Sequence, residues 1–304
     1  TNQRVSPMAI RYQTEAWDAK LVSQYDTFIF DCDGVLWRGG EKIQGAPEIV
    51  TKLMKLGKRV YFVTNNSTKS RAQYVDKITK YGIPIKDSSQ VLSSAFAAAS
   101  YLKSIKFNKK ALIVGHEGIE RELKLHDIKY VNSTEVLGGK QWAVKDLLKL
   151  KIDKEIGAVV VGMDLEFTYS KSALAALTIQ ANEGCFLLST NQDHTFPAEG
   201  GKFLPGSGAG VAHIEAASNM KAINVGKPER FLFEHLRKSC NDIKLQRTIM
   251  VGDRLNTDMQ FGNNGGAHSL LVLSGVTLKE DLEKPIVQQQ RPRYVVESIS
   301  KLFG

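Results

Sequence analysis

The chain has 304 residues, enough to bury a large hydrophobic core and to form two domains. Its hydrophobic share of 42% and charged share of 24% are ordinary for a soluble globular protein. No segment approaches the roughly 20 consecutive apolar residues that a transmembrane helix needs, so we expect no membrane partner.

The net charge of +9 comes from 41 Lys and Arg against 32 Asp and Glu. The basic residues are scattered, and no basic run alternates with aromatic residues as in a nucleic-acid-binding groove. We therefore expect no nucleic-acid partner and attribute the charge to solubility and to attraction of an anionic small substrate. The three cysteines are far apart and suggest no disulfide framework or metal site. They favour a reducing cytosol, with the nucleus left open.

Short apolar runs rich in β-branched and aromatic residues alternate with helical patterns along the chain. One helix is expected around Ala72, Val75 and Ile78, with Gly82 as its stop, and another is expected to begin near Pro228. This alternation predicts an α/β fold built on parallel strands. The expected strands are residues 27–30, 60–63, 111–114, 158–161, 186–189, 223–225, 248–251 and 270–273.

Residues 206–210, Gly-Ser-Gly-Ala-Gly, look at first like a dinucleotide-binding loop. They lack the GxGxxG spacing, and we expect no strand directly before them. We interpret them as a turn that opens a helix continuing through Ala217, rather than as a cofactor site.

Polar side chains follow four of the expected strands at the point where each strand ends. Asp31 and Asp33 follow the first, Thr64 the second, Lys227 the sixth and Asp253 the seventh. Ligands of open α/β sheets bind at the carboxyl ends of the strands. We therefore predict that these four strands deliver acid, hydroxyl or amide, lysine and acid to one edge of one sheet.

The pair Asp31 and Asp33 has two interpretations. In an extended segment both carboxylates point to the same side, where they repel each other unless a cation neutralises them. Asp-Gly is also common turn chemistry, so the pair alone is compatible with a simple turn. The further acids Asp253 and Asp258 favour the first interpretation, because three hard oxygen ligands suit Mg²⁺.

Thr64, Asn65 and Lys227 also have ordinary alternatives. Most lysines are simply solvated, but one that faces acids and a phosphate compensates charge. Thr64 and Asn65 could cap the next helix, or bind phosphate oxygens through hydroxyl and backbone N–H groups. The two roles are compatible.

Together these segments resemble the four motifs of the haloacid dehalogenase superfamily, in order. They read Asp31-x-Asp33-Gly34, Thr64-Asn65, Gly226-Lys227-Pro228 and Gly252-Asp253-x-x-x-x-Asp258. Their flanks resemble the eukaryotic 4-nitrophenylphosphatase and phosphoglycolate phosphatase family, especially its fungal members. The likeness covers most of the chain and is thinner between residues 88 and 200. It implies a Rossmann-like doubly wound parallel sheet with an inserted α/β cap domain of the C2 type.

The resemblance also implies roles for individual residues. Asp31 would be the nucleophile that forms an aspartyl phosphate, and Asp33 the general acid and base. Mg²⁺ would be held by the Asp31 and Asp253 carboxylates and the Asp33 backbone carbonyl. Asp258 would lie in or near the layer of residues that surrounds these ligands. The phosphate would be bound by Thr64, Asn65, Asn66 and Lys227.

An acid at position 33 selects among the activities of the superfamily. Dehalogenases do not need it, and P-type ATPases carry a threonine there and let the aspartyl phosphate persist. We therefore expect a magnesium-dependent phosphomonoesterase for small phosphorylated metabolites, such as 4-nitrophenyl phosphate or 2-phosphoglycolate. A phosphomutase and a protein-directed phosphatase on the same fold remain the alternatives.

An inserted domain is expected because Thr64 and Lys227 are 163 positions apart (227 − 64), too far for one connection. We place the core domain at residues 1–87 and 203–304 and the cap at residues 88–202. The family implies that the cap excludes water and contacts the leaving group. A homodimer formed through the cap is left open.

The cap is expected to return to the core through a loop that contains Asp193, His194 and Phe196. In the family the corresponding loop helps to select the substrate. Relatives that act on pyridoxal phosphate carry a histidine just before its proline, whereas phosphoglycolate phosphatases carry an apolar residue. Phe196 therefore resembles the phosphoglycolate side, with simple packing of the cap against the core as its alternative role.

Overall fold

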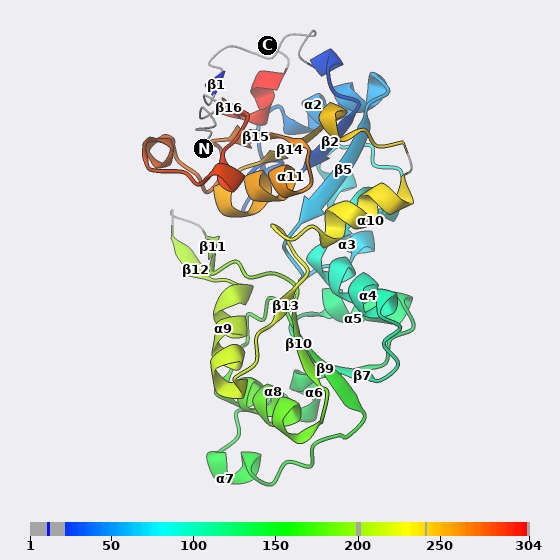
Figure 1. Ribbon diagram of the computed structural model, residues 1–304, viewed down its shortest axis with the longest axis vertical. Coiled ribbons are helices and arrows are strands. Elements are labelled where there is room, and N and C mark those ends of the chain that lie inside the picture. Colours follow the sequence, from blue (N-terminus) through cyan, green and yellow to red (C-terminus); the bar gives the residue numbers. More distant parts are fainter. Residues whose placement is uncertain (1–10, 13–21, 199–201, 241, 303–304) are drawn as a thin grey trace, which may run out of the picture. The chain divides into compact units, whose positions relative to one another are not determined.

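The computed structural model describes residues 11–12, 22–198, 202–240 and 242–302 (Figure 1). The chain forms two compact units. The first consists of Thr1–Tyr61 and Arg237–Gly304, and the second of Phe62–Leu236. Strands occur at all eight expected places, and both units are α/β.

The sheet of the first unit has parallel strands in the order β1-β16-β15-β14-β2-β5. Strand β5 runs across the boundary between the units. Because the central strands β2, β14 and β15 are buried almost throughout, they read as continuous apolar runs rather than as alternating ones. The strands are β1 (Arg11–Tyr12), β2 (Thr27–Phe30), β5 (Arg59–Thr64), β14 (Thr248–Gly252), β15 (His268–Val272) and β16 (Tyr294–Val296).

The order of these strands reverses between β2 and β14. From β14 the chain proceeds outward to β15 and β16, whereas from β2 it proceeds to β5 on the other side. The two central strands are parallel neighbours, with Phe30 opposite Val251. Such a reversal opens a crevice at the carboxyl ends of the strands, where doubly wound folds bind ligands. Asp31 and Asp253 are the first residues after these two strands.

The first unit also contains a small hairpin and two short helices near the sheet. Strand β3 (Trp37–Arg38) pairs with β4 (Glu41–Lys42) in antiparallel register, directly after the Asp31 segment. Helix α2 (Ala46–Lys55) buries Ile49, Val50 and Leu53. Helix α11 (Gln260–Asn264) follows a π-helical turn at Leu255–Met259 that carries Asp258.

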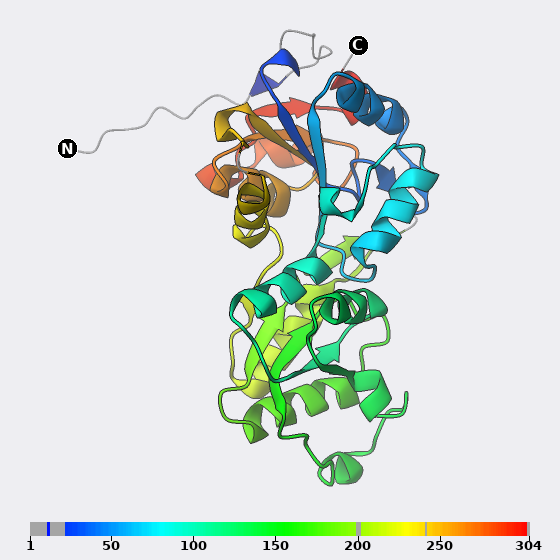
Figure 2. The same cartoon turned by 90° about the vertical axis from the view of Figure 1, so that its right-hand side faces the viewer.

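The second unit is built on a five-stranded parallel sheet with the order β13-β10-β9-β7-β8. Its strands are β7 (Lys110–Val114), β8 (Tyr130–Asn132), β9 (Ile156–Val161), β10 (Phe186–Ser189) and β13 (Ile223–Asn224). Helices α8 (Tyr169–Ala181) and α9 (Ser207–Ser218) cover one face of this sheet, where Leu174 and Val211 join one apolar core with Val159. Figure 2 shows the strands from a second side.

The remaining elements of the second unit lie before, between and after these strands along the chain. The second half of β5 pairs with β6, and an antiparallel ribbon is formed by β11 and β12. Their bounds are β6 (Val91–Ser93), α3 (Arg71–Lys80), α4 (Ser94–Ser104), α5 (Glu117–Leu125), α6 (Ser133–Val136), α7 (Val144–Leu147), β11 (Thr195–Pro197), β12 (Phe203–Pro205) and α10 (Phe231–Ser239), whose last residues cross the boundary.

Two expectations about strands were wrong. Strand β13, which precedes Lys227, pairs with β10 in the five-stranded sheet, so the four polar segments do not all follow strands of one sheet. Strand β12 directly precedes Gly206, where we expected none. Both strands are short and largely exposed, so they carry none of the buried apolar pattern that reveals a central strand.

The helices agree better with expectation. Helix α3 begins at a Ser70 and Gln73 capping box, and Gly82 follows it with a φ of +93°. Helix α9 opens at residues 206–210, as the turn interpretation predicted. Helix α10 begins at Phe231, three residues after Pro228.

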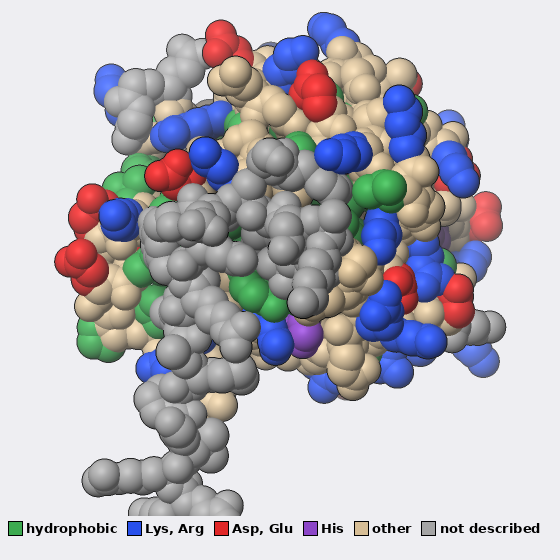
Figure 3. All heavy atoms as spheres, turned by 90° about the horizontal axis from the view of Figure 1, so that it is seen from above, with side chains coloured by type: hydrophobic (Ala, Val, Ile, Leu, Met, Phe, Trp, Pro, Cys, Tyr) green, Lys and Arg blue, Asp and Glu red, His purple; other side chains and the backbone are tan. Residues whose placement is uncertain are grey.

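In the part of the chain that the structure describes, no helix has the length and apolar composition to cross a membrane. On the face shown in Figure 3, described Lys and Arg side chains are spread out with Asp and Glu among them. This distribution resembles an ordinary mixed surface more than a single basic stripe.

Candidate active site

Three carboxylates of the first unit form a buried cluster. One oxygen each from Asp31, Asp253 and Asp258 lies within 4.8 Å of the others, and all three residues are buried. Asp31 follows β2 and Asp253 follows β14, and the Asp31 N–H donates to Val251 O at 2.8 Å, so the sheet itself fixes their spacing. Buried carboxylates at such distances repel strongly unless a cation neutralises them.

Backbone N–H groups hold two of these acids in place. Asp258 Oδ2 accepts from the N–H groups of Asp253 and Arg254, each at 3.1 Å. Asp253 Oδ2 accepts from the N–H of Val276 at 2.7 Å. Asp258 therefore shapes the loop that carries Asp253, while Asp253 is oriented from a third segment of the chain.

Gly34 is required by the close approach of its backbone to this cluster. Its φ is +86°, and a Cβ built on it would lie 2.4 Å from Asp253 Oδ2. Any side chain here would be strained and would displace the carboxylate. Gly34 of the Asp-x-Asp-Gly segment is thus explained by its close packing against Asp253.

The acidic cluster fits a small divalent cation. Its donors are hard carboxylate oxygens, which Mg²⁺ prefers, and no histidine or cysteine belongs to it. The cradle is tight on the side of Gly34, and also at Gly275, where a Cβ would lie 1.9 Å from Asp253 Oδ2. These residues therefore fit Mg²⁺ on chemical grounds.

Asp33 lies in the same loop as Asp31 but does not belong to the cluster. It is half-buried, and its Oδ1 accepts a hydrogen bond from Trp37 Nε1 at 2.7 Å. The backbones of the two residues also form an isolated β-bridge. Asp33 is thus held differently from Asp31, although the two acids are two positions apart.

In the second unit, Asn65 joins the predicted phosphate-binding loop to Lys227. Its side chain accepts from the Lys227 N–H at 2.8 Å and donates to the Lys227 carbonyl at 3.1 Å. The same amide nitrogen lies 3.1 Å from Asp193 Oδ2, to which it also donates. The Asn65 side chain therefore acts as a clamp between segments 162 and 128 positions away.

The backbone carbonyl of Asn65 is fixed as well. It accepts from Ser94 Oγ and from Asn191 Nδ2, both at 2.6 Å. Asn191 is buried, and its own Oδ1 accepts from the Asp193 N–H at 3.1 Å. Gly226 lies against this junction, since a Cβ there would be 2.3 Å from Thr190 O and 2.9 Å from Asn65 Oδ1.

The other predicted phosphate-binding residues lie in the same loop. Thr64 is buried at the end of β5, and its hydroxyl accepts from the Asn66 N–H at 3.1 Å. Asn66 Oδ1 accepts from the N–H and hydroxyl of Thr68, at 2.9 and 2.7 Å. Lys227 is 2% exposed, and its ammonium donates to Val63 O at 3.1 Å. A lysine this buried needs anionic or carbonyl partners, which suits a phosphate-facing role.

The residues expected to select the substrate lie at the ribbon β11 and β12. Asp193 is half-buried in the Asn65 and Asn191 junction, whereas His194 is exposed. Phe196 is half-buried and pairs with Leu204 across the ribbon. Asp193 thus has a structural role in addition to any contact with substrate.

Sequence reasoning missed Trp37, Ser94 and Asn191 as parts of the site. Each acts through a hydrogen bond to a predicted residue, namely Asp33 or Asn65. Trp37 could have been noticed four positions after Asp33, but Ser94 and Asn191 are 29 and 126 positions from Asn65. A single sequence carries no signal for pairs so far apart.

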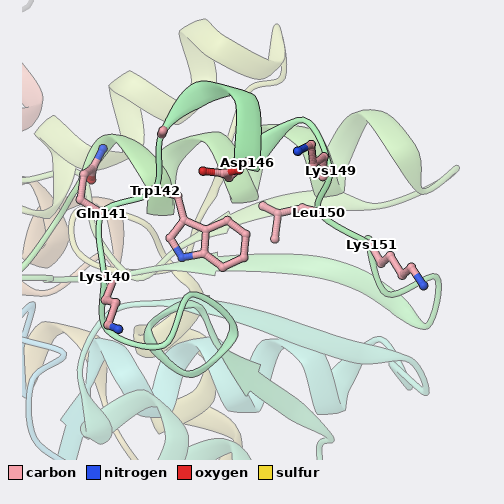
Figure 4. Close-up of a pocket in the computed structure, with 8 residues that line it drawn as sticks. Lys140, Gln141, Trp142, Asp146, Lys149, Leu150 and Lys151 are labelled. Carbon is pink, nitrogen blue, oxygen red and sulfur yellow. The ribbon is translucent and has the colours of Figure 1, made fainter.

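A separate pocket of about 520 Å³ in the second unit shares no residue with the predicted site (Figure 4). Its lining includes Trp142, Lys140, Asp146 and Lys149. The Trp142 indole N–H donates to Leu137 O at 2.9 Å. The pocket is therefore not part of the predicted active site.

Comparison with known proteins adds independent information. Family profiles described as haloacid dehalogenase-like hydrolase and HAD-hydrolase-like match residues 28–129 and 224–302. A chloroplastic phosphoglycolate phosphatase of Arabidopsis thaliana is 40% identical over 100% of this chain and 83% of its own length. A 4-nitrophenylphosphatase of Schizosaccharomyces pombe is 40% identical over 93% of this chain and 95% of its own.

A solved structure is similar as well. The glycerol phosphate phosphatase of Mycobacterium tuberculosis, in complex with magnesium, matches with a TM-score of 0.76 and 28% identity. The match covers 96% of this chain and 79% of that one.

Proposed function

The chain belongs to the haloacid dehalogenase-like hydrolases and is a phosphomonoester hydrolase, and we propose that it releases phosphate from small metabolites with Mg²⁺ as its metal. The observation that carries the proposal is the buried cluster of Asp31, Asp253 and Asp258 at the reversal point of the sheet. The cap that covers such a site is proposed to comprise residues 88–202. We propose the cytosol as its location, because the spacing of the three cysteines suggests no disulfide framework.

Asp31 and Asp33 divide the chemistry between them in this proposal. An Asp31 oxygen attacks phosphorus as the bond to the leaving oxygen breaks, and Asp33 gives its proton to that oxygen. Asp33 then takes a proton from a water molecule as the water oxygen attacks phosphorus. The second step frees inorganic phosphate and restores the Asp31 carboxylate.

The metal and phosphate ligands are proposed from the motifs and the chemistry of their donors. Asp31, Asp253 and the Asp33 carbonyl would hold Mg²⁺, which neutralises charge on the transferred phosphoryl group when bound. Asp258 supports this set through its bonds to the Asp253 loop. Lys227, the Thr64 hydroxyl, Asn66 and the backbone of Asn65 would bind the phosphate oxygens, because the Asn65 side chain is engaged by Lys227 and Asp193.

Phosphate release from 4-nitrophenyl phosphate tests the activity and its metal together. We expect steady release with Mg²⁺, loss of activity in excess chelator and recovery when Mg²⁺ is restored. Ca²⁺ should inhibit, because its larger and more variable shell suits in-line transfer poorly. Full activity in chelator would contradict a metal-dependent site.

Transfer of phosphate within a sugar phosphate, with no inorganic phosphate released, would instead indicate a phosphomutase.

Phe196 supports a substrate with a small leaving group. We expect a higher kcat/KM for 2-phosphoglycolate, or for a similar two- or three-carbon phosphate, than for pyridoxal phosphate. The variant Phe196→His should shift the ratio toward pyridoxal phosphate. Phe203→His is the matched control, because neighbouring registers of a strand face opposite sides of the ribbon. A wild-type preference for pyridoxal phosphate would overturn this specificity and leave the phosphatase activity standing.

A further inference from the structure

The loop at residues 32–37 is folded back on itself so that its last residue reaches its second. The carbonyl of Cys32 accepts from the N–H groups of Leu36 and Trp37, at 2.9 and 3.3 Å, and the Gly34 N–H donates to Trp37 O at 2.7 Å. These bonds leave the loop little freedom. They place the indole of Trp37 against the carboxylate of Asp33.

The contact between the two side chains is short and well supported. Trp37 Nε1 donates to Asp33 Oδ1 at 2.7 Å, and Trp37 is 0% exposed. The tryptophan is also fixed through its backbone, since it opens β3 and pairs with Lys42 of β4. Within the described ranges this is the one hydrogen bond to the Asp33 carboxylate.

A buried indole N–H requires a hydrogen-bond acceptor. For Trp37 this acceptor is the carboxylate of the proposed catalytic acid Asp33 rather than a backbone carbonyl. Asp33 is half-buried, so its carboxylate could adopt other rotamers if nothing held it. An N–H donor at Oδ1 restricts χ1 and χ2 together. It also leaves the proton of the neutral acid on the other oxygen, Oδ2.

We propose that Trp37 is a positioning residue that holds the Asp33 carboxyl in the orientation needed for proton transfer. This inference rests on the proposed function, in which Asp33 acts on the leaving oxygen. The Oδ2 proton passes to that oxygen as its bond to phosphorus breaks and the Asp31–phosphorus bond forms. Trp37 exchanges no proton in either step, because its indole N–H keeps its proton and remains hydrogen-bonded to Asp33 Oδ1.

The variant Trp37→Phe tests the proposal, since it keeps an aromatic ring and removes only the donor. The readout is kcat/KM for two substrates, which reports the steps through departure of the leaving group. For an alkyl phosphate such as 2-phosphoglycolate, we expect a loss of about 10- to 100-fold. This is the usual effect of one hydrogen bond to a charged group, because Asp33 becomes a carboxylate as it gives up its proton. For 4-nitrophenyl phosphate, whose leaving group needs no proton, the loss should be within about threefold.

Trp142→Phe is the matched control. It removes an indole N–H from the Leu137 carbonyl in the second unit, far along the chain from the predicted catalytic residues. Both substrates should keep the wild-type kcat/KM. In an Asp33→Asn background, Trp37→Phe should add little further loss on the alkyl phosphate, because the two residues act as one unit.

A spectroscopic measurement keeps the proposal testable if Trp37→Phe does not fold. The chain has three tryptophans, so three indole N–H signals are expected in a ¹⁵N-labelled sample. The Trp37 signal should lie downfield and move upfield in Asp33→Ala, while the Trp142 signal stays in place. Equal loss on both substrates in a folded Trp37→Phe protein, or no moving indole signal in Asp33→Ala, would overturn the proposal. Failure of the wild-type protein to hydrolyse either substrate would instead refute the proposed function.

Discussion

Replacing Asp31 with asparagine should abolish phosphate release without unfolding the protein. The amide cannot form the aspartyl phosphate, and it weakens the acidic cluster that suits Mg²⁺. Loss of a nucleophile in other hydrolases lowers kcat by on the order of 10⁶-fold, and we expect a loss of similar size here. Steady-state release of phosphate from 4-nitrophenyl phosphate is the measurement, with circular dichroism as the check on folding.

The matched control for this variant is Asp26→Asn. Asp26 lies at the opposite end of β2 from Asp31 and forms an ion pair with Arg247 at 2.5 Å. The pair is partly exposed, so its removal should change stability by no more than about 1 kcal/mol. Activity should stay near the wild-type level. Near-normal turnover by a folded Asp31→Asn protein would refute the assignment of the nucleophile.

Replacing Asp33 with asparagine should give a smaller and selective defect. Asp31 can still attack when the leaving group is good, but hydrolysis of the aspartyl phosphate loses its base. We expect a fall in kcat of about 10²- to 10⁴-fold, the usual range for general acid–base catalysis. In kcat/KM the loss should be greater for an alkyl phosphate than for 4-nitrophenyl phosphate.

Rapid-mixing measurements separate the two roles of Asp33. With 4-nitrophenyl phosphate, the Asp33→Asn enzyme should release a burst of 4-nitrophenol as an equal amount of phosphoenzyme accumulates. If both substrates lose kcat/KM equally, Asp33 is not the acid that protonates the leaving group. If no burst appears although kcat is low, the slow step precedes the aspartyl phosphate, and the role of Asp33 as base is wrong.

The sequence predicts the central strands, and the acids that follow two of them, for a physical reason. Buried parallel strands such as β2 and β14 require short, continuous apolar runs, and residues after them such as Asp31 and Asp253 stand out by contrast. Proximity of these two acids follows from strand adjacency alone. The three-carboxylate cluster found in the structure is consistent with that prediction.

The sequence does not reveal features that depend on which distant residues come into contact, because these leave no local pattern of hydrophobic and polar residues. Strand β13 is short and little buried, and only its pairing with β10 shows to which sheet it belongs. The clamp between Asn65 and Lys227 joins residues 162 positions apart, and asparagine is common in loops of every kind. The bond from Trp37 to Asp33 depends on the folded-back loop, which local propensity does not encode.

The hydrogen bonds of Asn65 set limits on how this enzyme can be recombined with its relatives. A chimera that takes the loop at residues 64–66 from one parent and Asn191 from another separates a carbonyl from its donor at 2.6 Å. Lys227 is constrained in the same way, because its backbone N–H donates to the Asn65 side chain and its carbonyl accepts from it. Viable crossovers should therefore transfer Asn65, Asn191 and Lys227 as one set, together with Ser94 and Asp193, which also bond to Asn65.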